Sequence, residues 1–315
     1  MNRPFDDEAL RLCRESLRRN SRSFSWASLL LPAAARDPVA VIYAWCRRCD
    51  DAIDDVHAGE QAEALERLAA EVDAIYAGEP MRDVVLTAFQ VVVRRHRIPR
   101  VYVDELLLGF SMDLGVVRYA TREELLLYCY RVAGVVGLML CHVIGLGDQT
   151  LLGRAAHLGM AMQLTNICRD VAEDWGRGRR YVPSELLPAG SPEPGGPEPF
   201  PPGLAPAYVE PLRHLLAIAD RYYTSADAGI VALGFRSALA VRMARRVYAA
   251  IGSVIGKRNH DVASGRAVVS GAAKLGIMLR AIAATIAELP RRLATRSRLA
   301  PPRKIVRFED ATLAA

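Results

Sequence analysis

Two clusters of carboxylate side chains, more than a hundred residues apart, are the residues best suited to chemistry in this sequence. The first is the run DDAIDD, in which Asp50 and Asp54 stand four residues apart, as do Asp51 and Asp55. On a helix each pair shares one face, one turn apart. Like charges at that spacing destabilise a helix by about 0.2–0.5 kcal/mol per pair, and a divalent cation removes the conflict. The run therefore indicates a metal site, and the spacing leaves open which pair binds the ion.

The second cluster lies in the run NICRDVAED, where Asn166, Asp170 and Asp174 follow one another at intervals of four residues. A helix would carry all three on one face, with Glu173 beside them. The rest of this segment is apolar, and an acidic stripe is costly to bury unless it is neutralised. Metal sites in helical bundles are built from two such faces. Because the ligands are oxygens without histidine, Mg²⁺ or Mn²⁺ is expected rather than zinc.

A metal site of this kind needs an anionic substrate to complete the ligand shell of the ions. Candidate donors to phosphate oxygens lie near both motifs. They are Arg47, Arg48, Arg169, Arg177, Arg179 and Arg180, together with the hydroxyls of Ser21 and Ser23. An arginine offers a planar fork of donors that matches phosphate. Metal ions and arginines together would polarise a diphosphate leaving group, which is electrostatic catalysis.

The segment YCYRVAGVVGLM offers a wall for an apolar substrate. Tyr128 and Tyr130 supply aromatic faces, and the small residues from Ala133 to Gly137 supply a smooth surface. Such walls suit a hydrocarbon chain and a carbocation. A helix of glycine, valine and tyrosine is also ordinary core packing, so this segment gains its meaning from the two acidic motifs.

The elements that position these residues are predicted to be helices. Glycine and proline separate long segments with helical periodicity, and no segment alternates convincingly as a strand does. Thr121, Pro99 and Pro206 stand at plausible helix starts. Helices are expected at about 6–20, 36–55, 60–77, 81–96, 100–115, 122–147, 150–176, 206–229, 236–256 and 267–289. The predicted fold class is therefore all-α, in a single domain.

The domain is expected to cover residues 1–294. Within it, the segment 188–206 holds eight prolines and four glycines, and it is expected to be a surface loop or a disordered insertion. The remaining segment, 295–315, is basic and is expected to be a flexible tail. Contact of this tail with anionic lipid head groups is the weaker alternative.

Composition excludes several classes of protein. The net charge is +6, but 35 acidic residues are interspersed and no nucleic-acid motif appears, so nucleic acid is not an expected partner. No obligate protein partner is evident. Six scattered cysteines and a polar start without a signal peptide predict a cytoplasmic protein without disulfides. The apolar stretch 132–147 is shorter than the roughly 20 residues that a spanning helix needs, so it is expected to be a core helix.

In combination these motifs make the chain similar to the squalene/phytoene synthase family, the head-to-head prenyl synthases. The resemblance covers about residues 10–285. It is carried by NSRSFSWASLLLP, YAWCRRCDDAIDD, LLLGFSMDLGVVRYATREELLLYCYRVAGVVGLM, AMQLTNICRDVAEDWGRGRRYVP and the series Tyr248, Arg266, Lys274. It implies an isoprenoid-synthase helical bundle around a central cavity.

The resemblance also implies roles for individual residues. Asp50 and Asp54, rather than the pair one residue later, would hold Mg²⁺ and substrate diphosphate together with Asn166, Asp170 and Asp174. The residues that match catalytic positions are Asp50, Asp54, Tyr128, Tyr130, Gln163, Asp170 and Asp174. Both tyrosines match aromatic positions near the reacting cation. Those that match substrate-binding positions are Ser21, Ser23, Tyr43, Arg47, Arg169, Tyr248, Arg266 and Lys274.

The motifs are most similar to those of bacterial phytoene synthases. This implies condensation of two geranylgeranyl diphosphates, through a cyclopropyl prephytoene diphosphate, to phytoene and diphosphate, the first committed step of carotenoid biosynthesis. NADPH is not expected. Ser28 and Ala40, if they face the cavity, leave room for a twenty-carbon chain. One alternative is a relative that uses farnesyl diphosphate to make dehydrosqualene, hydroxysqualene or squalene. The other is a catalytically inactive assembly factor of the same fold.

Overall fold

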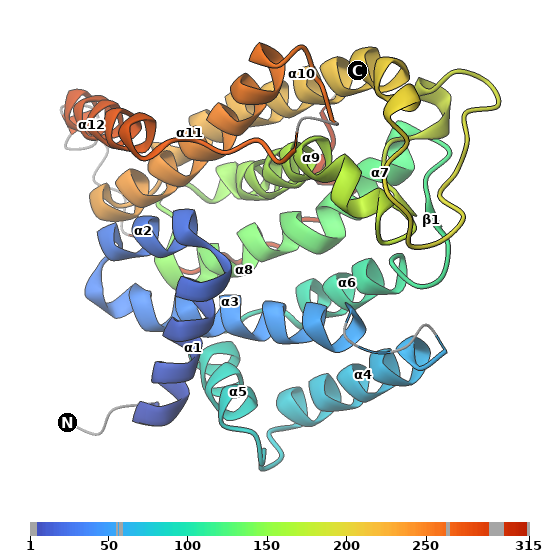
Figure 1. Cartoon of the computed structure of the whole chain (residues 1–315). Coiled ribbons are helices and arrows are strands. Elements are labelled where there is room, and N and C mark those ends of the chain that lie inside the picture. Colours follow the sequence, from blue (N-terminus) through green and yellow to red (C-terminus); the bar gives the residue numbers. More distant parts are fainter. Residues whose placement is uncertain (1–4, 55, 57–58, 263–264, 290–298, 314–315) are drawn as a thin grey trace.

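The computed structural model describes residues 5–54, 56, 59–262, 265–289 and 299–313. Nearly all its regular elements are helices (Figure 1), so the predicted all-α fold is confirmed. The helices are α1 (Asp7–Asn20), α2 (Arg22–Leu30), α3 (Ala33–Asp54), α4 (Gln61–Ala77), α5 (Val84–His96), α6 (Arg100–Ser111), α7 (Arg122–Cys129), α8 (Val135–Ile144), α9 (Gly153–Trp175), α10 (Ala205–Ile230), α11 (Phe235–Lys257) and α12 (Gly271–Ala287). A π-helical turn, Tyr130–Gly134, joins α7 to α8.

Helix starts follow capping residues that the sequence displays. Thr121 accepts a hydrogen bond from the backbone N–H of Glu124 at the start of α7, as predicted. The helix α2 is missing from the predicted set, because its nine residues are too few to show a clear period. It begins where Ser21 ends α1 and accepts a hydrogen bond from the N–H of Phe24. Ser21 is therefore a structural cap.

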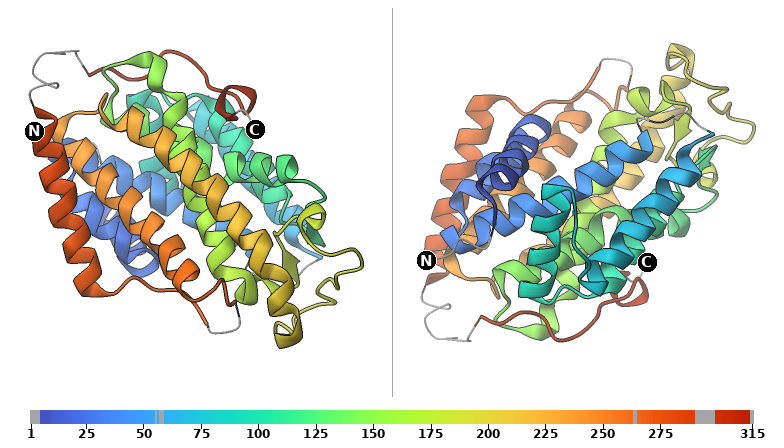
Figure 2. Two further views of the ribbon diagram at one scale, coloured as in Figure 1. Left: turned by 90° about the horizontal axis from the view of Figure 1, so that it is seen from above. Right: turned by 90° about the horizontal axis from the view of Figure 1, so that it is seen from below.

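The helix α9 lies at the centre of the bundle (Figures 1 and 2). It packs against α10 and α11 on one side and against α8 and the π-helical turn on the other. The helix α3 contacts α8 and is covered by α1, α4 and α5. Figure 2 shows α12 at the edge of the bundle, outside α11. The two helices that carry the acidic motifs are thus both internal, and α8 contacts both.

Two glycines let α9 approach the π-helical turn and α8 closely. A methyl group at Gly159 would collide with the carbonyl oxygen of Ala133, and one at Gly137 with the carbonyl oxygen of Ala155. Backbone therefore meets backbone at this crossing. The close contact sets the distance between α8 and α9. Residues of both helices line the central cavity.

The helical stretch Arg122–Ile144, which includes the apolar segment 132–147 up to its last residues, is long and apolar enough to cross a membrane. Half of its most apolar window is buried inside the fold. Its second half packs against α3, α6 and α9. This position accounts for its apolar character, as predicted for a core helix.

The segment 295–315, expected to be a flexible tail, contacts the bundle through its described residues 299–313. Ala300 pairs with Leu146 in a β-bridge, and Val306 is buried. The hydroxyl of Tyr130 donates to the carbonyl of Val306 at 2.7 Å, and the hydroxyl of Tyr102 accepts from the N–H of Val306 at 3.1 Å. Buried tyrosine hydroxyls need partners, and the tail backbone supplies them. Residues 295–298 and 314–315 lie outside the described part of the chain.

The Pro-rich segment 188–206 is a surface loop, which is one of the two structures expected for it. Side chains of the loop attach it to the bundle. Phe200 is buried between the rings of Trp175 and Tyr208, with centroid distances of 5.4 and 5.3 Å. The buried Arg180 forms an ion pair of 3.1 Å with Glu193 of the loop. Arg180 belongs to β2 (Arg179–Arg180), which pairs in parallel with β1 (Val117–Arg118). The last residues of the segment already belong to α10.

Candidate active site

A central cavity of about 510 Å³ brings the predicted motifs together. Its polar lining comes mainly from the C-terminal halves of α3 and α9, and its apolar lining comes from their N-terminal halves and from α2, α8, α10 and α11. The polar lining residues that matter here are Tyr43, Arg47, Asp50, Asp54, Asp113, Tyr128, Gln163, Asn166, Asp170, Asp174, Arg177, Arg179, Tyr181 and Tyr248. The cavity therefore has one charged region and a larger apolar one.

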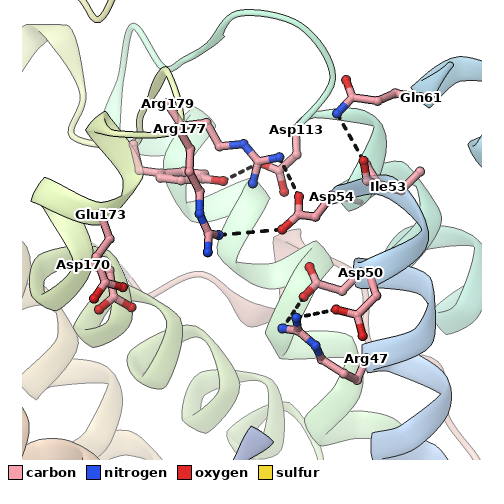
Figure 3. Close-up of polar contacts among 12 residues, drawn as sticks. Arg47, Asp50, Ile53, Asp54, Gln61, Asp113, Asp170, Glu173, Arg177 and Arg179 are labelled. Carbon is pink, nitrogen blue, oxygen red and sulfur yellow. Dashed lines mark hydrogen bonds and ion pairs between the residues drawn. The ribbon is translucent and has the colours of Figure 1, made fainter. Parts of the chain in front are cut away.

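The first motif presents Asp50 and Asp54 to the cavity (Figure 3). Arg47 donates to Asp50 at 2.8 Å and also pairs with Asp51, which does not line the cavity. Asp54 accepts from Arg179 at 2.6 Å. Of the two pairs that spacing allows, the structure thus has the first facing the cavity. Asp55, from the second pair, lies outside the described residues.

The second motif faces the first across the cavity, with Asp170 on α9 opposite Asp50 and Asp54 on α3 (Figure 3). Arg169 donates to Asp170 at 2.7 Å, and Arg266 pairs with it at 3.1 Å. Glu173 is half-exposed and does not line the cavity.

Burial and mutual repulsion shape the charge of these carboxylates. Burial, and then the nearby charge of Asp54, raises the pKa of Asp50 to about 6. Burial, and then the charge of Asp170, raises the pKa of Asp174 to about 8. A cation between the two motifs would lower both pKa values, because an opposite charge favours the ionised form.

The residues present fit Mg²⁺, provided that the substrate completes its ligand shell. No group of three His, Cys, Asp or Glu side chains among the described residues stands close enough to hold an ion alone. Arginines neutralise the carboxylates instead. The amide oxygen of Asn166 is buried without a hydrogen-bond partner, while its nitrogen donates to Gln163 at 3.4 Å. A buried acceptor left without a donor is the group that a cation satisfies.

The sequence did not single out Asp113, which lies just after α6 and lines the cavity. It accepts hydrogen bonds from the hydroxyls of Tyr128 at 2.8 Å and Tyr181 at 2.7 Å. The available signal was a single acid inside the apolar run LLLGFSMDLGV. A lone polar residue in such a run is either a turn or a buried functional group, and spacing cannot separate the two.

Tyr128 lines the cavity as predicted, but the prediction that Tyr130 does so is wrong. The π-helical turn begins at Tyr130 and directs it to the tail, where its ring lies 5.7 Å from that of Phe308. Because Tyr128 and Tyr130 are two residues apart on a helix, they cannot share a face.

Of the other residues predicted to bind substrate, some line the cavity and others do not. Tyr43 and Tyr248 line the cavity, and Phe24 packs between their rings at 6.2 and 5.8 Å. Burial, and then the neighbouring Tyr248, raises the pKa of Tyr43 to about 12, so its hydroxyl stays a donor. The hydroxyl of Ser21 interacts with Tyr248. Arg169 and Arg266 reach the site through Asp170, whereas Ser23 and Lys274 are not among the lining residues.

Two arginines that were predicted to bind phosphate form ion pairs within the fold instead. Arg48 makes a bidentate pair with Glu71 of α4 at 2.6 and 2.8 Å. Arg180 is buried against the loop. Ala40 is also buried in the core and does not line the cavity, whereas Ser28 does. Helix periodicity places a residue on a face but does not say which neighbour covers that face.

Comparison with known proteins bears on the same region. The squalene/phytoene synthase family matches residues 17–273. The chain is 38% identical to a 15-cis-phytoene synthase of Paracoccus sp., over 84% of this chain and 88% of that protein. It is 37% identical to the 15-cis-phytoene synthase of Pantoea ananas, over 92% and 94% respectively. A dehydrosqualene synthase crystallised with a ligand superposes with a TM-score of 0.78 and 25% identity, covering 90% of this chain and all of that one.

The orientation of the first motif can be tested by ligand binding alone. Asp50→Asn is expected to weaken the Mg²⁺-dependent binding of inorganic diphosphate at least tenfold, because a lining carboxylate is lost. Asp51→Asn should change it less than about threefold. Titration calorimetry with and without Mg²⁺ measures both variants. Equal losses in the two would contradict the assignment.

Proposed function

This chain belongs to the squalene/phytoene synthase family, and we propose that it is the prenyltransferase that condenses two geranylgeranyl diphosphates to phytoene in carotenoid biosynthesis. The observation that carries the proposal is the cavity, which is lined by carboxylates of α3 and α9, by nearby arginines and by a larger set of apolar residues. Its charged region suits two diphosphates and its apolar region suits two hydrocarbon chains.

The overall reaction balances without an added oxidant or reductant. Two carbon–oxygen bonds break and release two diphosphates, and the joined forty-carbon skeleton loses two protons. In the first half, the cation from one substrate alkylates the double bond of the other, and loss of a proton closes a cyclopropane. In the second half, that intermediate ionises, rearranges and loses the second proton. NADPH is therefore not required for phytoene, whereas squalene needs a hydride.

The chain's own residues would bind and orient the two diphosphates. Arg47, Arg177 and Arg179 now pair with carboxylates of the first motif. Phosphate oxygens compete for those guanidinium groups, and the freed carboxylates can then hold cations. Asp50, Asp54, Asn166, Asp170 and Asp174 would hold Mg²⁺, which would supply Lewis-acid polarisation of the leaving diphosphate. The apolar walls exclude water, which would otherwise trap a carbocation.

Product extraction tests the proposed function. With geranylgeranyl diphosphate and Mg²⁺ the purified protein should release a forty-carbon hydrocarbon with three conjugated double bonds, and EDTA should abolish its formation. Incubation with farnesyl diphosphate, with and without NADPH, separates squalene, dehydrosqualene and hydroxysqualene activity. Absence of phytoene, with a thirty-carbon product in its place, would assign the chain to the farnesyl-using branch. Absence of both products would support an inactive relative.

Ser28 on α2 is proposed to set the length of the accepted chain. Its small side chain lines the apolar part of the cavity. Ser28→Phe should lower kcat/KM for geranylgeranyl diphosphate at least tenfold relative to farnesyl diphosphate, because a pocket that loses volume rejects the longer chain. Ser25→Phe, on the same helix but outside the cavity lining, is the matched control. An unchanged ratio of the two kcat/KM values in Ser28→Phe would rule out this role.

We also propose a cytoplasmic enzyme that meets the membrane peripherally. All six cysteines are free, which suits a reducing compartment. A forty-carbon hydrocarbon leaves an apolar cavity for lipid rather than water. The exposed Arg303 and Lys304 of the tail suit anionic head groups. Sedimentation with vesicles that contain anionic lipid should carry the protein down at low salt, and neutral vesicles serve as the control. Equal sedimentation with both, or none with either, would contradict this electrostatic contact.

A further inference from the structure

We propose that Asp113 is a positioning residue that turns the hydroxyls of Tyr128 and Tyr181 away from the reacting carbocation, so that the cation meets their oxygen lone pairs and ring faces. The proposal rests on the proposed function and deepens it, since Asp113 belongs to neither acidic motif.

The bonding of Asp113 differs from that of three other carboxylates in the cavity lining. Asp50, Asp54 and Asp170 form ion pairs with arginines. Asp113 is 7% exposed, and each of its oxygens accepts one tyrosine hydroxyl, from Tyr181 at 2.7 Å and from Tyr128 at 2.8 Å. The carboxylate is thereby capped by two phenols, and both phenols line the cavity.

Three tyrosine rings near Asp113 form a cluster in which each ring contacts the other two. The ring centroids of Tyr128 and Tyr181 lie 5.1 Å apart, and Tyr119 lies 5.5 Å from Tyr128 and 6.1 Å from Tyr181. A ring face attracts a cation through its quadrupole. A phenol that donates its hydrogen to a carboxylate is polarised further, which makes its oxygen and ring more negative.

This arrangement solves a chemical problem of the cavity. A bare carboxylate beside a carbocation would form a carbon–oxygen bond and end the reaction as an ester. Each oxygen of Asp113 accepts a phenol hydroxyl, which weakens it as a nucleophile even though Asp113 lines the cavity. The oxygens and rings of the two phenols still stabilise the cation. The tyrosines thus pass the negative potential of the carboxylate to the cation while their hydroxyls occupy its oxygens.

The surrounding scaffold holds the three partners in place. Asp113 follows α6, Tyr128 lies in the last turn of α7, and Tyr181 follows β2. The pairing of β1 with β2 aligns the segment before Tyr181 with the segment after Asp113. Arg180, next to Tyr181, is fixed by Ser184 at 2.6 Å and by Glu193 of the Pro-rich loop. The Pro-rich loop therefore helps to position Tyr181 through Arg180.

The experiment compares Asp113→Asn with Tyr128→Phe, Tyr181→Phe and the corresponding multiple variants. An asparagine donates to one of the two hydroxyls and so reverses it. With geranylgeranyl diphosphate, Asp113→Asn should lower kcat about 100-fold and leave KM within about threefold, because the cation and not the diphosphate is affected. Binding of Mg²⁺ with inorganic diphosphate, measured by calorimetry, should also stay within about threefold. Asp104→Asn, which changes a half-exposed carboxylate of α6, is the control.

The energetic coupling between Asp113 and the two tyrosines shows whether Asp113 acts through them or independently. In the background of Tyr128→Phe and Tyr181→Phe together, Asp113→Asn should lower kcat less than about threefold further, because its only task has gone. A full additional 100-fold loss would overturn the proposal. So would a tenfold weaker binding of Mg²⁺ and diphosphate in Asp113→Asn, which would make the residue a metal ligand. If Asp113→Asn does not fold, unchanged kcat in both tyrosine variants overturns it. A wild-type protein that binds diphosphate but makes no phytoene would fail the proposed function instead.

Discussion

Repulsion between carboxylates inside a cavity is the constraint on which the rest of this structure depends. Asp50 and Asp54 on α3 face Asp170 on α9 across a cavity that Asp174 also lines, and burial raises the pKa of Asp50 and Asp174. Such a concentration of negative charge is costly away from water. Arginines lower that cost, and they are the groups that a diphosphate would draw away. The same residues therefore stabilise the free protein and prepare it for metal ions and substrate.

The apolar part of the cavity depends on a different kind of contact. Glycines at 137 and 159 allow α9 to touch α8 and the π-helical turn backbone to backbone. The helices pack tightly at this crossing, and the cavity is the space that remains between them. The π-helical turn also separates the two tyrosines of the YCY run, so that Tyr128 serves the cavity while Tyr130 binds the tail. A cavity-lining residue and a structural anchor thus lie two positions apart in one segment.

The segments that sequence composition marks as loose are anchored where the structure describes them. The Pro-rich loop supplies Glu193 to Arg180, and residues 299–313 supply backbone partners to Tyr102 and Tyr130. Both act on elements that border the cavity. Proline and basic residues predict the absence of regular structure, but they say nothing about anchoring by buried aromatic rings and hydroxyl groups.

The sequence by itself determined the helical fold, both acidic motifs and the family, because helical periodicity and the spacing of four residues are local properties of the chain. Spacing put Asn166, Asp170 and Asp174 on one helix face, and only the family resemblance chose Asp50 and Asp54 over Asp51 and Asp55; all five chosen residues line the cavity. The sequence could not find Asp113, separate Tyr128 from Tyr130, or tell that Arg48, Arg180 and Ala40 face away from the cavity. Only the tertiary structure decided these points, since each depends on which distant segment covers a given helix face. A hydrogen bond such as that between Asp113 and Tyr181 joins residues 68 positions apart, and no local pattern encodes it.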